Sequence, residues 1–251
     1  MGADGAATLG TIFGQNTALQ PVRKLCNHAD KLIIGTSGPI GIGQRVVGMI
    51  SQMWDERKFG GEVVSYQAMQ LVREKIGPML ALELKYAQEV AKVLGPGIAQ
   101  QNSVSSAMLA VPVAREVQLY SFGCTGDPEQ STDDLPFMTT GSGQSLADPF
   151  LAFLRAVFWK QRRRPTTGDG IFATYWALRH AIRTNTGGVS DPIQMMTLQK
   201  DDRGNFHVKE LDSAELEETK QAVDAAESHL SGFDFEQAES STPPSAPTQT
   251  S

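Results

Sequence analysis

Segments with helical periodicity occur in two pairs along this sequence, and their order limits the possible folds more than any other feature. Apolar residues recur at spacings of three and four over about residues 39–54 and 65–94, and again over 150–158 and 171–182. β-like runs precede and follow each pair. A parallel doubly wound sheet needs strands and helices to alternate one by one. The order therefore favours two helical layers that flank mostly antiparallel sheets.

The run KLIIGTS, residues Lys31–Ser37, predicts a short buried strand that leads into the first helix from about Pro39. Two β-favouring runs between 103 and 122 predict a pair of strands, with Pro112 near an edge or a bend. The runs PIQMMTL and NFHVKEL predict a hairpin. A charged helix from Ser213 to about Leu230 closes the predicted fold.

Composition places the chain among globular proteins and excludes several classes. Hydrophobic residues make up 40% of the 251 residues and charged residues 20%. No run approaches the roughly 18 to 20 apolar residues of a membrane helix, and the start, Met1–Asp4, lacks the features of an export signal. Cys26 and Cys124 have neither zinc-site spacing nor the number needed for a disulfide framework. We therefore expect a cytoplasmic protein with no membrane partner and no metal.

Charge is distributed unevenly along the chain. The net charge is -6, but residues 201–251 hold 3 basic and 12 acidic residues, which gives -9 and leaves +3 on the first 200. Such a body lacks the broad cationic face that nucleic acid requires, so no nucleic-acid partner is expected. One basic cluster, residues 160–165 (KQRRRP), is interpreted as a solvated loop or a subunit contact rather than a phosphate site.

Two glycine-rich turns are candidate functional positions. Gly38–Gly43 has the spacing GxxGxG, the reverse of the dinucleotide fingerprint GxGxxG, so nucleotide binding is a minor alternative and no cofactor is expected. Its amides either hold an anionic oxygen or belong to a plain turn. Gly141–Gly143 likewise forms a plain turn or exposes the Ser142 hydroxyl beside a site. The four histidines show no metal or catalytic spacing and are interpreted as structural or solvated.

Five segments, in sequence order, resemble the proteasome β-subunit family and its bacterial homologues, within the N-terminal nucleophile (Ntn) hydrolases. Together they span roughly residues 3–230. The segments are ADGAATLG (3–10), VRKL (22–25), IIGTSGPIGIGQR (33–45), TTGSGQS (139–145) and TNTGGVSDPIQMMTL (184–198). The resemblance implies an α+β fold, a four-layer αββα sandwich of two antiparallel sheets between helical layers. It makes residues 1–230 one Ntn-hydrolase domain. Residues 231–251 are acidic and rich in Pro, Ser and Thr, with nothing to bury, so their composition predicts a disordered tail.

The same resemblance implies a threonine-type peptidase mechanism. The catalyst of the family is a threonine at the mature N-terminus, whose hydroxyl attacks a peptide carbonyl while its own α-amino group acts as the base. By motif, Asp4 matches the aspartate that orients the site and Lys24 the lysine that favours the reactive threonine. Gly38 matches the donor of the oxyanion N–H, and Ser142 the serine near the terminal amine. The implied partners are a peptide or unfolded-protein substrate and copies of the chain in a homo-oligomeric ring; an ATPase partner is unknown.

Three departures from the family pattern affect this expectation. The strand that carries the nucleophile should lie a dozen or more residues before Asp4, as a rough hairpin-arm estimate, yet the sequence begins at Met1. The first strand is thus missing as written, and neither Thr8 nor Thr11 replaces the nucleophile. Ala6 stands where the family usually has arginine. Near TNTGGV, Arg183 and Thr186 occupy the places of the family's aspartate and serine.

Three hypotheses follow, and whether the chain is an enzyme stays open among them. In the first, the start has been assigned too far downstream or the chain is truncated, and the whole protein is a threonine peptidase. In the second, the chain is an inactive proteasome-like subunit kept for assembly. In the third, the glycine turn of Gly38–Gly43 binds a nucleotide. If the first is right, the candidate residues should converge on a groove beside the missing strand.

Overall fold

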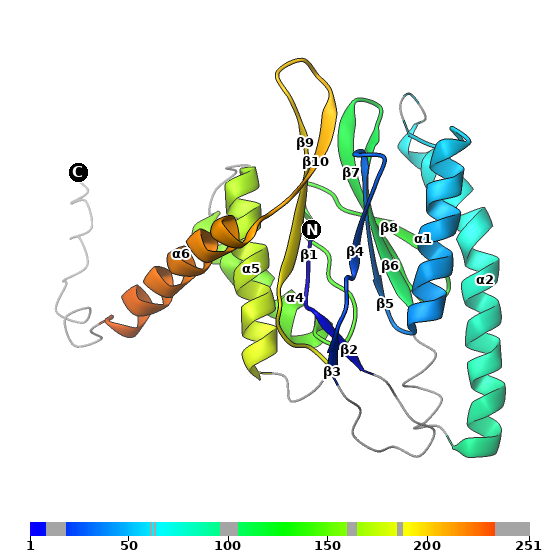
Figure 1. Ribbon diagram of the computed structural model, residues 1–251, viewed down its shortest axis with the longest axis horizontal. Helices are drawn as coiled ribbons and strands as arrows, with labels where there is room; N and C mark the ends of the chain where they lie inside the picture. Colours follow the sequence, from blue (N-terminus) through cyan, green and yellow to red (C-terminus); the bar gives the residue numbers. More distant parts are fainter. Residues whose placement is uncertain are drawn as a thin grey trace, which may run out of the picture.

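The computed structural model of the chain is a sandwich of two antiparallel sheets between helices, as Figure 1 shows, so the predicted α+β fold class is confirmed. It describes residues 1–8, 19–60, 62, 64–95, 105–159, 165–184 and 188–233. Most of the predicted tail (231–251), the basic residues of the 160–165 cluster and Thr186 lie outside these ranges. The division into a 1–230 domain and a tail therefore stays a prediction.

The larger sheet has five strands in the order β4-β5-β6-β7-β8, and all neighbours are antiparallel. Its strands are β4 (Leu25–His28), β5 (Leu32–Ser37), β6 (Ser106–Val113), β7 (Glu116–Phe122) and β8 (Pro128–Gln130). The second sheet has the order β1-β9-β10, and a separate pair joins β2 to β3. These strands are β1 (Gly2–Ala3), β9 (Gln194–Lys200), β10 (Phe206–Glu210), β2 (Ala6–Thr8) and β3 (Leu19–Pro21).

Helices cover the outer faces of both sheets. In Figure 1, α1 and α2 lie on the side of the five-stranded sheet, and α4, α5 and α6 lie on the side of β9. Their bounds are α1 (Ile40–Asp55), α2 (Ser65–Leu94), α4 (Gln144–Phe158), α5 (Thr167–Thr184) and α6 (Ser213–Ser231). The start of α6 is fixed by a capping box in which Asp212 and Glu215 satisfy each other's backbone N–H groups. None of the described helices is long and apolar enough to span a membrane.

The outer face of the five-stranded sheet forms the main core. Alternate residues of a strand point to opposite faces, so one set of alternate side chains in each strand meets α1 and α2. Those from the sheet are large and apolar, and they pack with Val46 and Ile50 of α1 and with Val72 and Ile76 of α2. The sheet residues of this cluster are Leu32, Ile34, Ala107, Leu109, Val111, Val113, Tyr120 and Phe122.

The inner face of the same sheet is filled at one end and hollow at the other. At the end nearer the β9–β10 hairpin tip, apolar side chains from both sheets form a small buried cluster, which we name the closed end. At the opposite end the inner-face side chains line a cleft, which we name the open end. The buried residues of the closed end are Leu25, Ile33, Ala110, Met196 and Val208. The inner-face residues of the open end include Ser37, Ser106, Met108 and Ser121.

The strand and helix predictions agree with the structure where the pattern was periodic. The strand at 31–37, the helix that follows Pro39 and the helix at 65–94 are all present, as are the β6–β7 pair and the β9–β10 hairpin. Pro112 lies in β6 beyond the last β5 partner, Ala110, so its missing N–H costs no bond to β5. Five short strands, β1 to β4 and β8, were not predicted.

Candidate functional site

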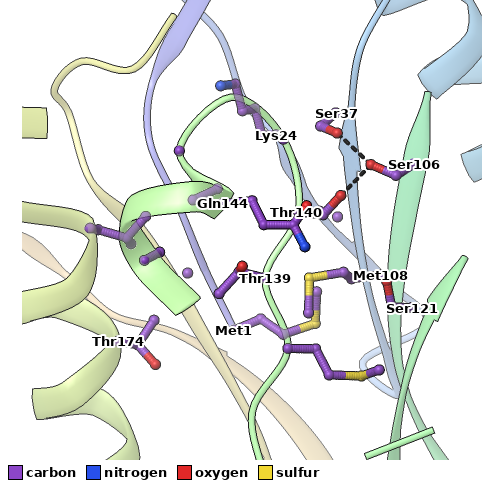
Figure 2. Close-up of a pocket in the computed structure, with 18 of the residues that line it drawn as sticks. Met1, Lys24, Ser37, Ser106, Met108, Ser121, Thr139, Thr140, Gln144 and Thr174 are labelled. Carbon is purple, nitrogen blue, oxygen red and sulfur yellow. Dashed lines mark hydrogen bonds between the residues drawn. The ribbon is translucent and has the colours of Figure 1, made fainter. Parts of the chain in front are cut away.

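A large cleft opens between the two sheets at the open end, with a volume of about 2370 Å³. Its walls come from β1, the inner faces of β5, β6 and β7, the loop before α4, and the inward sides of α4 and α5. All four residues singled out by the sequence, Asp4, Lys24, Gly38 and Ser142, line this cleft. Figure 2 shows part of it, with Lys24 and several hydroxyl side chains among the residues that line it.

Asp4 and Lys24 form an ion pair at the edge of the smaller sheet. The Lys24 Nζ donates to Asp4 Oδ2 at 2.7 Å. Only 12% of the Asp4 side chain and 20% of the Lys24 side chain are exposed to solvent. Because few waters reach these groups, the attraction between them is screened far less than in a surface pair. The pair thus brings together two positions that are 20 residues apart in the sequence.

Backbone groups fix the orientation of the Asp4 carboxylate. Its other oxygen, Oδ1, accepts hydrogen bonds from the Ala6 N–H at 2.8 Å and the Ser190 N–H at 3.3 Å. The Gly5 N–H donates to the Ser190 carbonyl oxygen at 2.8 Å, which ties the segment after β1 to the segment before β9. A carboxylate held by two backbone donors and an ammonium keeps one geometry. Ser190 is a site residue that the sequence analysis did not assign.

Gln194, at the start of β9, holds the backbone on both sides of Arg23. Its Oε1 accepts from the Lys24 N–H at 3.1 Å, and its Nε2 donates to the Val22 carbonyl oxygen. The chain therefore enters β4 with the Lys24 side chain turned to Asp4. No spacing or periodicity distinguishes this glutamine, so sequence reasoning missed it.

Gly38 and Ser142 belong to the two turns on the wall formed by the ends of β5 and the loop before α4. Gly38 has a φ of 100°, which an L side chain rarely adopts, so glycine is required there. The Ser142 hydroxyl donates to the Gly188 carbonyl oxygen at 2.8 Å. Gly141, beside Ser142, likewise has a positive φ of 89°, so both turns depend on a glycine, and both line the cleft.

A chain of hydroxyl groups runs along the same wall. The Oγ atoms of Ser37 and Ser106 are 2.6 Å apart, and Ser106 also hydrogen bonds to Thr140, as the dashed lines in Figure 2 show. The segment before α4 is thus tied by side chains to β5 and β6, which the backbone ladder already joins. The serine at the start of β6 was visible as a polar residue in an apolar run, but nothing in the sequence connected it to Thr140.

The remaining polar features lie away from the cleft or offer no second site. Arg183, which stands in place of the family's aspartate, pairs with Glu227 of α6 at 2.9 Å and does not line the cleft. His207 bridges Asp30 and Asp201 outside the cleft, and its partners raise the pKa of the imidazole. Within the described ranges no cluster of three or more His, Cys, Asp or Glu residues could hold a metal ion.

The cleft therefore offers orienting and charge-stabilising groups. An ammonium, a fixed carboxylate and a glycine turn surround a space open to solvent, while the described residues that line it include no histidine to serve as a base. The α-amino group of Met1 donates to the Met196 carbonyl oxygen at 2.8 Å, and burial lowers its pKa to about 6. This amine is therefore held against β9.

Comparison with solved structures shows the same fold in Anbu proteins. Anbu from Hyphomicrobium sp. strain MC1 superposes with a TM-score of 0.58 at 16% sequence identity, over 93% of this chain and 92% of that one. Anbu (ancestral beta-subunit) from Yersinia bercovieri gives a TM-score of 0.57 at 14% identity over the same shares. At such low identity the likeness shows the fold alone.

The sequence-based identification with the proteasome β-subunit family is corrected by these comparisons. No family model matches the chain, and no curated protein matches it by sequence. The five segments quoted above therefore do not establish membership in that family. Anbu proteins are proteasome-like, so the likeness that remains is one of architecture, carried by the sheets and helices and not by residue identity.

Proposed function

We propose that the chain is a proteasome-like subunit whose cleft binds extended polypeptide, and that it acts as a threonine-type peptidase when a strand with an N-terminal threonine lies beside β1. The observation that carries this proposal is the Asp4–Lys24 ion pair, mostly buried and placed in the cleft with Gly38 and Ser142. An ion pair hidden from solvent at the rim of a hollow does little for packing, because there is no core to pack against. It does prepare an electrostatic environment for a ligand.

The edge of β1 is where an added strand would pair. In the order β1-β9-β10, β1 has a partner on one side only among the described strands, and it lines the cleft with Gly2 and Ala3. An open strand edge pairs readily with an extended segment through backbone hydrogen bonds. A strand added there would run within the cleft beside Asp4 and Lys24.

The candidate residues would then have complementary roles. An α-amino group has a pKa near 8 and accepts a hydroxyl proton near neutral pH, and a neighbouring cation such as Lys24 lowers the pKa of such a group further. Asp4 would hold Lys24 in place, and the Gly38 N–H would stabilise the negative oxygen that forms when the threonine hydroxyl attacks a peptide carbonyl. Ser142 would lie near the terminal amine.

The test compares the 251-residue chain with a chain extended at its N-terminus by one strand that begins with threonine. We expect the 251-residue chain to cleave a fluorogenic peptide no faster than buffer, and the extended chain to cleave it measurably. Lys24→Ala in the extended chain should abolish cleavage, because it removes the cation. Arg23→Ala is the matched control, since Arg23 is the adjacent cation but is 61% exposed and pairs with Glu210 instead.

Two outcomes would contradict the peptidase. One is an extended chain that folds, as judged by circular dichroism, yet cleaves nothing; this would favour the inactive assembly subunit. The other is cleavage by the 251-residue chain that survives Lys24→Ala. A nucleotide titration that shifts the melting temperature would instead support the nucleotide-binding hypothesis. The homo-oligomeric ring and the cytoplasmic location stay predictions, and light scattering that finds only a 27 kDa monomer would count against the ring.

A further inference from the structure

The two halves of α2 differ in burial although they belong to one continuous helix. Up to Leu80 the helix contributes five buried apolar side chains to the main core, and from Ala81 to Val93 none of its side chains is fully buried. Four large apolar residues of the second half are instead exposed. They are Leu82 (44%), Tyr86 (58%), Val90 (44%) and Val93 (81%), and we name them the α2 stripe.

The α2 stripe continues the face that the first half buries. Its spacings of four, four and three match the spacings of the buried residues 68, 72, 76 and 79, so both sets lie on one side of the helix. Length explains the exposure: α2 has 30 residues and α1 has 16, which correspond to about 45 Å and about 24 Å. Figure 1 shows α2 ending beyond the lower end of α1.

Charged residues follow one side of the α2 stripe in a self-complementary order. Lys85 and Glu89 lie one turn apart on that side, and Lys92 pairs with Glu89 at 2.7 Å. On the other side, Glu83 is already paired with Arg45 of α1 at 2.6 Å. Lys85 forms no ion pair with another described residue, and Glu89, whose Oε1 accepts from Lys92, lies one turn away. A second, oppositely directed copy of the same helix would bring its carboxylate to Lys85 and its ammonium to Glu89.

We propose that the α2 stripe binds the α2 stripe of a second copy of this chain, with the two helices antiparallel about a two-fold axis near residue 87. That axis places Leu82 against the partner's Val93 and Tyr86 against the partner's Val90. It also places Lys85 against the partner's Glu89, and the symmetry repeats this ion pair. An isologous contact of this kind uses the same patch on both copies, so one sequence satisfies both sides.

The size of the stripe limits the strength of the contact. Thirteen residues of helix are about 20 Å long, and a stripe about 10 Å wide covers a few hundred Å² on each copy, compared with the roughly 800 Å² of a standard stable interface. The α2 contact alone should therefore give a weak dimer that strengthens with other contacts. It does not depend on the proposed peptidase, because it is on the other side of the five-stranded sheet from the cleft.

Cysteine crosslinking tests the direction of the two helices. A mixture of Leu82→Cys and Val93→Cys chains should form a crosslinked dimer under mild oxidation, because the two sulfurs meet across the axis. Either variant alone should not, since eleven residues of helix separate a position from its symmetry mate by about 16 Å, far beyond disulfide reach. Gln88→Cys, exposed on the opposite side of the helix, is the matched control, and wild type reports any crosslink through Cys26 or Cys124.

Charge reversal tests the ion pairs. In sedimentation equilibrium, Lys85→Glu should raise the dimer dissociation constant about ten-fold, because both symmetry-related pairs become repulsive. Lys85→Glu combined with Glu89→Lys should bring it back towards wild type. A crosslink in each single-cysteine variant, no crosslink in the mixture, or a double variant as weak as Lys85→Glu would overturn the proposal. None of these readouts involves peptide cleavage, so they fail or succeed independently of the proposed activity.

Discussion

The closed end and the open end of the inter-sheet layer are built from the same strands, yet only one of them is a core. β5 supplies Ile33 to the closed end and Ser37 to the open end, and β6 supplies Ala110 and Ser106 in the same way. Strand alternation sends all four side chains to the inner face. The difference in packing between the two ends therefore depends on the residue types along one face. Small polar residues at one end of a strand can leave a cleft there without any change in the strand's backbone.

The outer face of the sheet supplies the apolar burial that the open end lacks. Hydroxyl side chains on the inner face bury little apolar area, so they add little to the free energy of folding. The alternate residues of the same strands, such as Leu109 and Phe122, are completely buried against α1 and α2. The five-stranded sheet is thus held by its outer face and by the closed end, and the open end is available for a site.

The largest expected effect comes from truncating the closed end. Ile33 is 1% exposed, so Ile33→Ala should lower the free energy of unfolding by about 3 kcal/mol through lost burial and a residual cavity. Met108, on the same inner face but lining the cleft, is the control, and Met108→Ala should cost less than about 1 kcal/mol because solvent already reaches the site. Urea denaturation measures both. Equal losses would mean that the two ends do not differ in packing.

The next effect concerns the ion pair at the cleft rim. Lys24→Met should lower the free energy of unfolding by about 2 kcal/mol, because the Asp4 carboxylate then stays mostly buried without its cation. Arg23→Met, which breaks an exposed pair with Glu210, should cost less than about 0.5 kcal/mol. Chemical denaturation of the two adjacent variants provides the comparison. A Lys24→Met chain as stable as wild type would show that the pair contributes nothing to folding.

The elements that could be predicted from the sequence are those in which apolar residues recur at a regular spacing. The helices at 40–55 and 65–94 and the apolar strand at 32–37 could be located because burial on one face leaves a pattern. β8 (Pro128–Gln130) has three residues and no pattern, and it exists because its backbone pairs with β7, for example Gln130 with Tyr120. Two-residue β1 is likewise defined only by its pairing with β9.

Less of the candidate site than of the fold could be predicted from the sequence. Asp4, Lys24, Gly38 and Ser142 were assigned by motif resemblance, and their common location in the cleft follows from strand pairing over 138 positions of chain. Gln194 was missed because its side chain binds backbone groups of distant residues, and Ser190 because it acts through its own backbone N–H; neither contact has a signature in the sequence. The resemblance led to a wrong family assignment, because sequences that share few residues can have the same fold.

The smallest expected effect is a pH dependence at the exposed hairpin beside the closed end. His207 joins the β9–β10 hairpin to the β4–β5 turn through Asp30 at 2.9 Å, and it also contacts Asp201 of its own hairpin at 3.2 Å. These two hydrogen bonds raise the pKa of His207, although desolvation and neighbouring Lys31 oppose the shift. A group whose pKa is raised in the folded state stabilises the fold fully at pH values below its unfolded pKa. This contribution is lost as the pH rises through its folded pKa.

His207→Gln should therefore be less stable than wild type at about pH 5.5, and the difference in stability should shrink by about pH 9. The His207 hydrogen bond lowers the pKa of Asp30, and hydrogen bonds from Asn205, with a smaller part from His207, lower the pKa of Asp201. Acid therefore weakens the cluster only when it protonates these carboxylates. His28→Gln is the control, because His28 pairs with Asp55 on the side of α1. Thermal melts at the two pH values measure the difference, and a gap between wild type and His207→Gln that widens towards high pH would contradict the assigned sign.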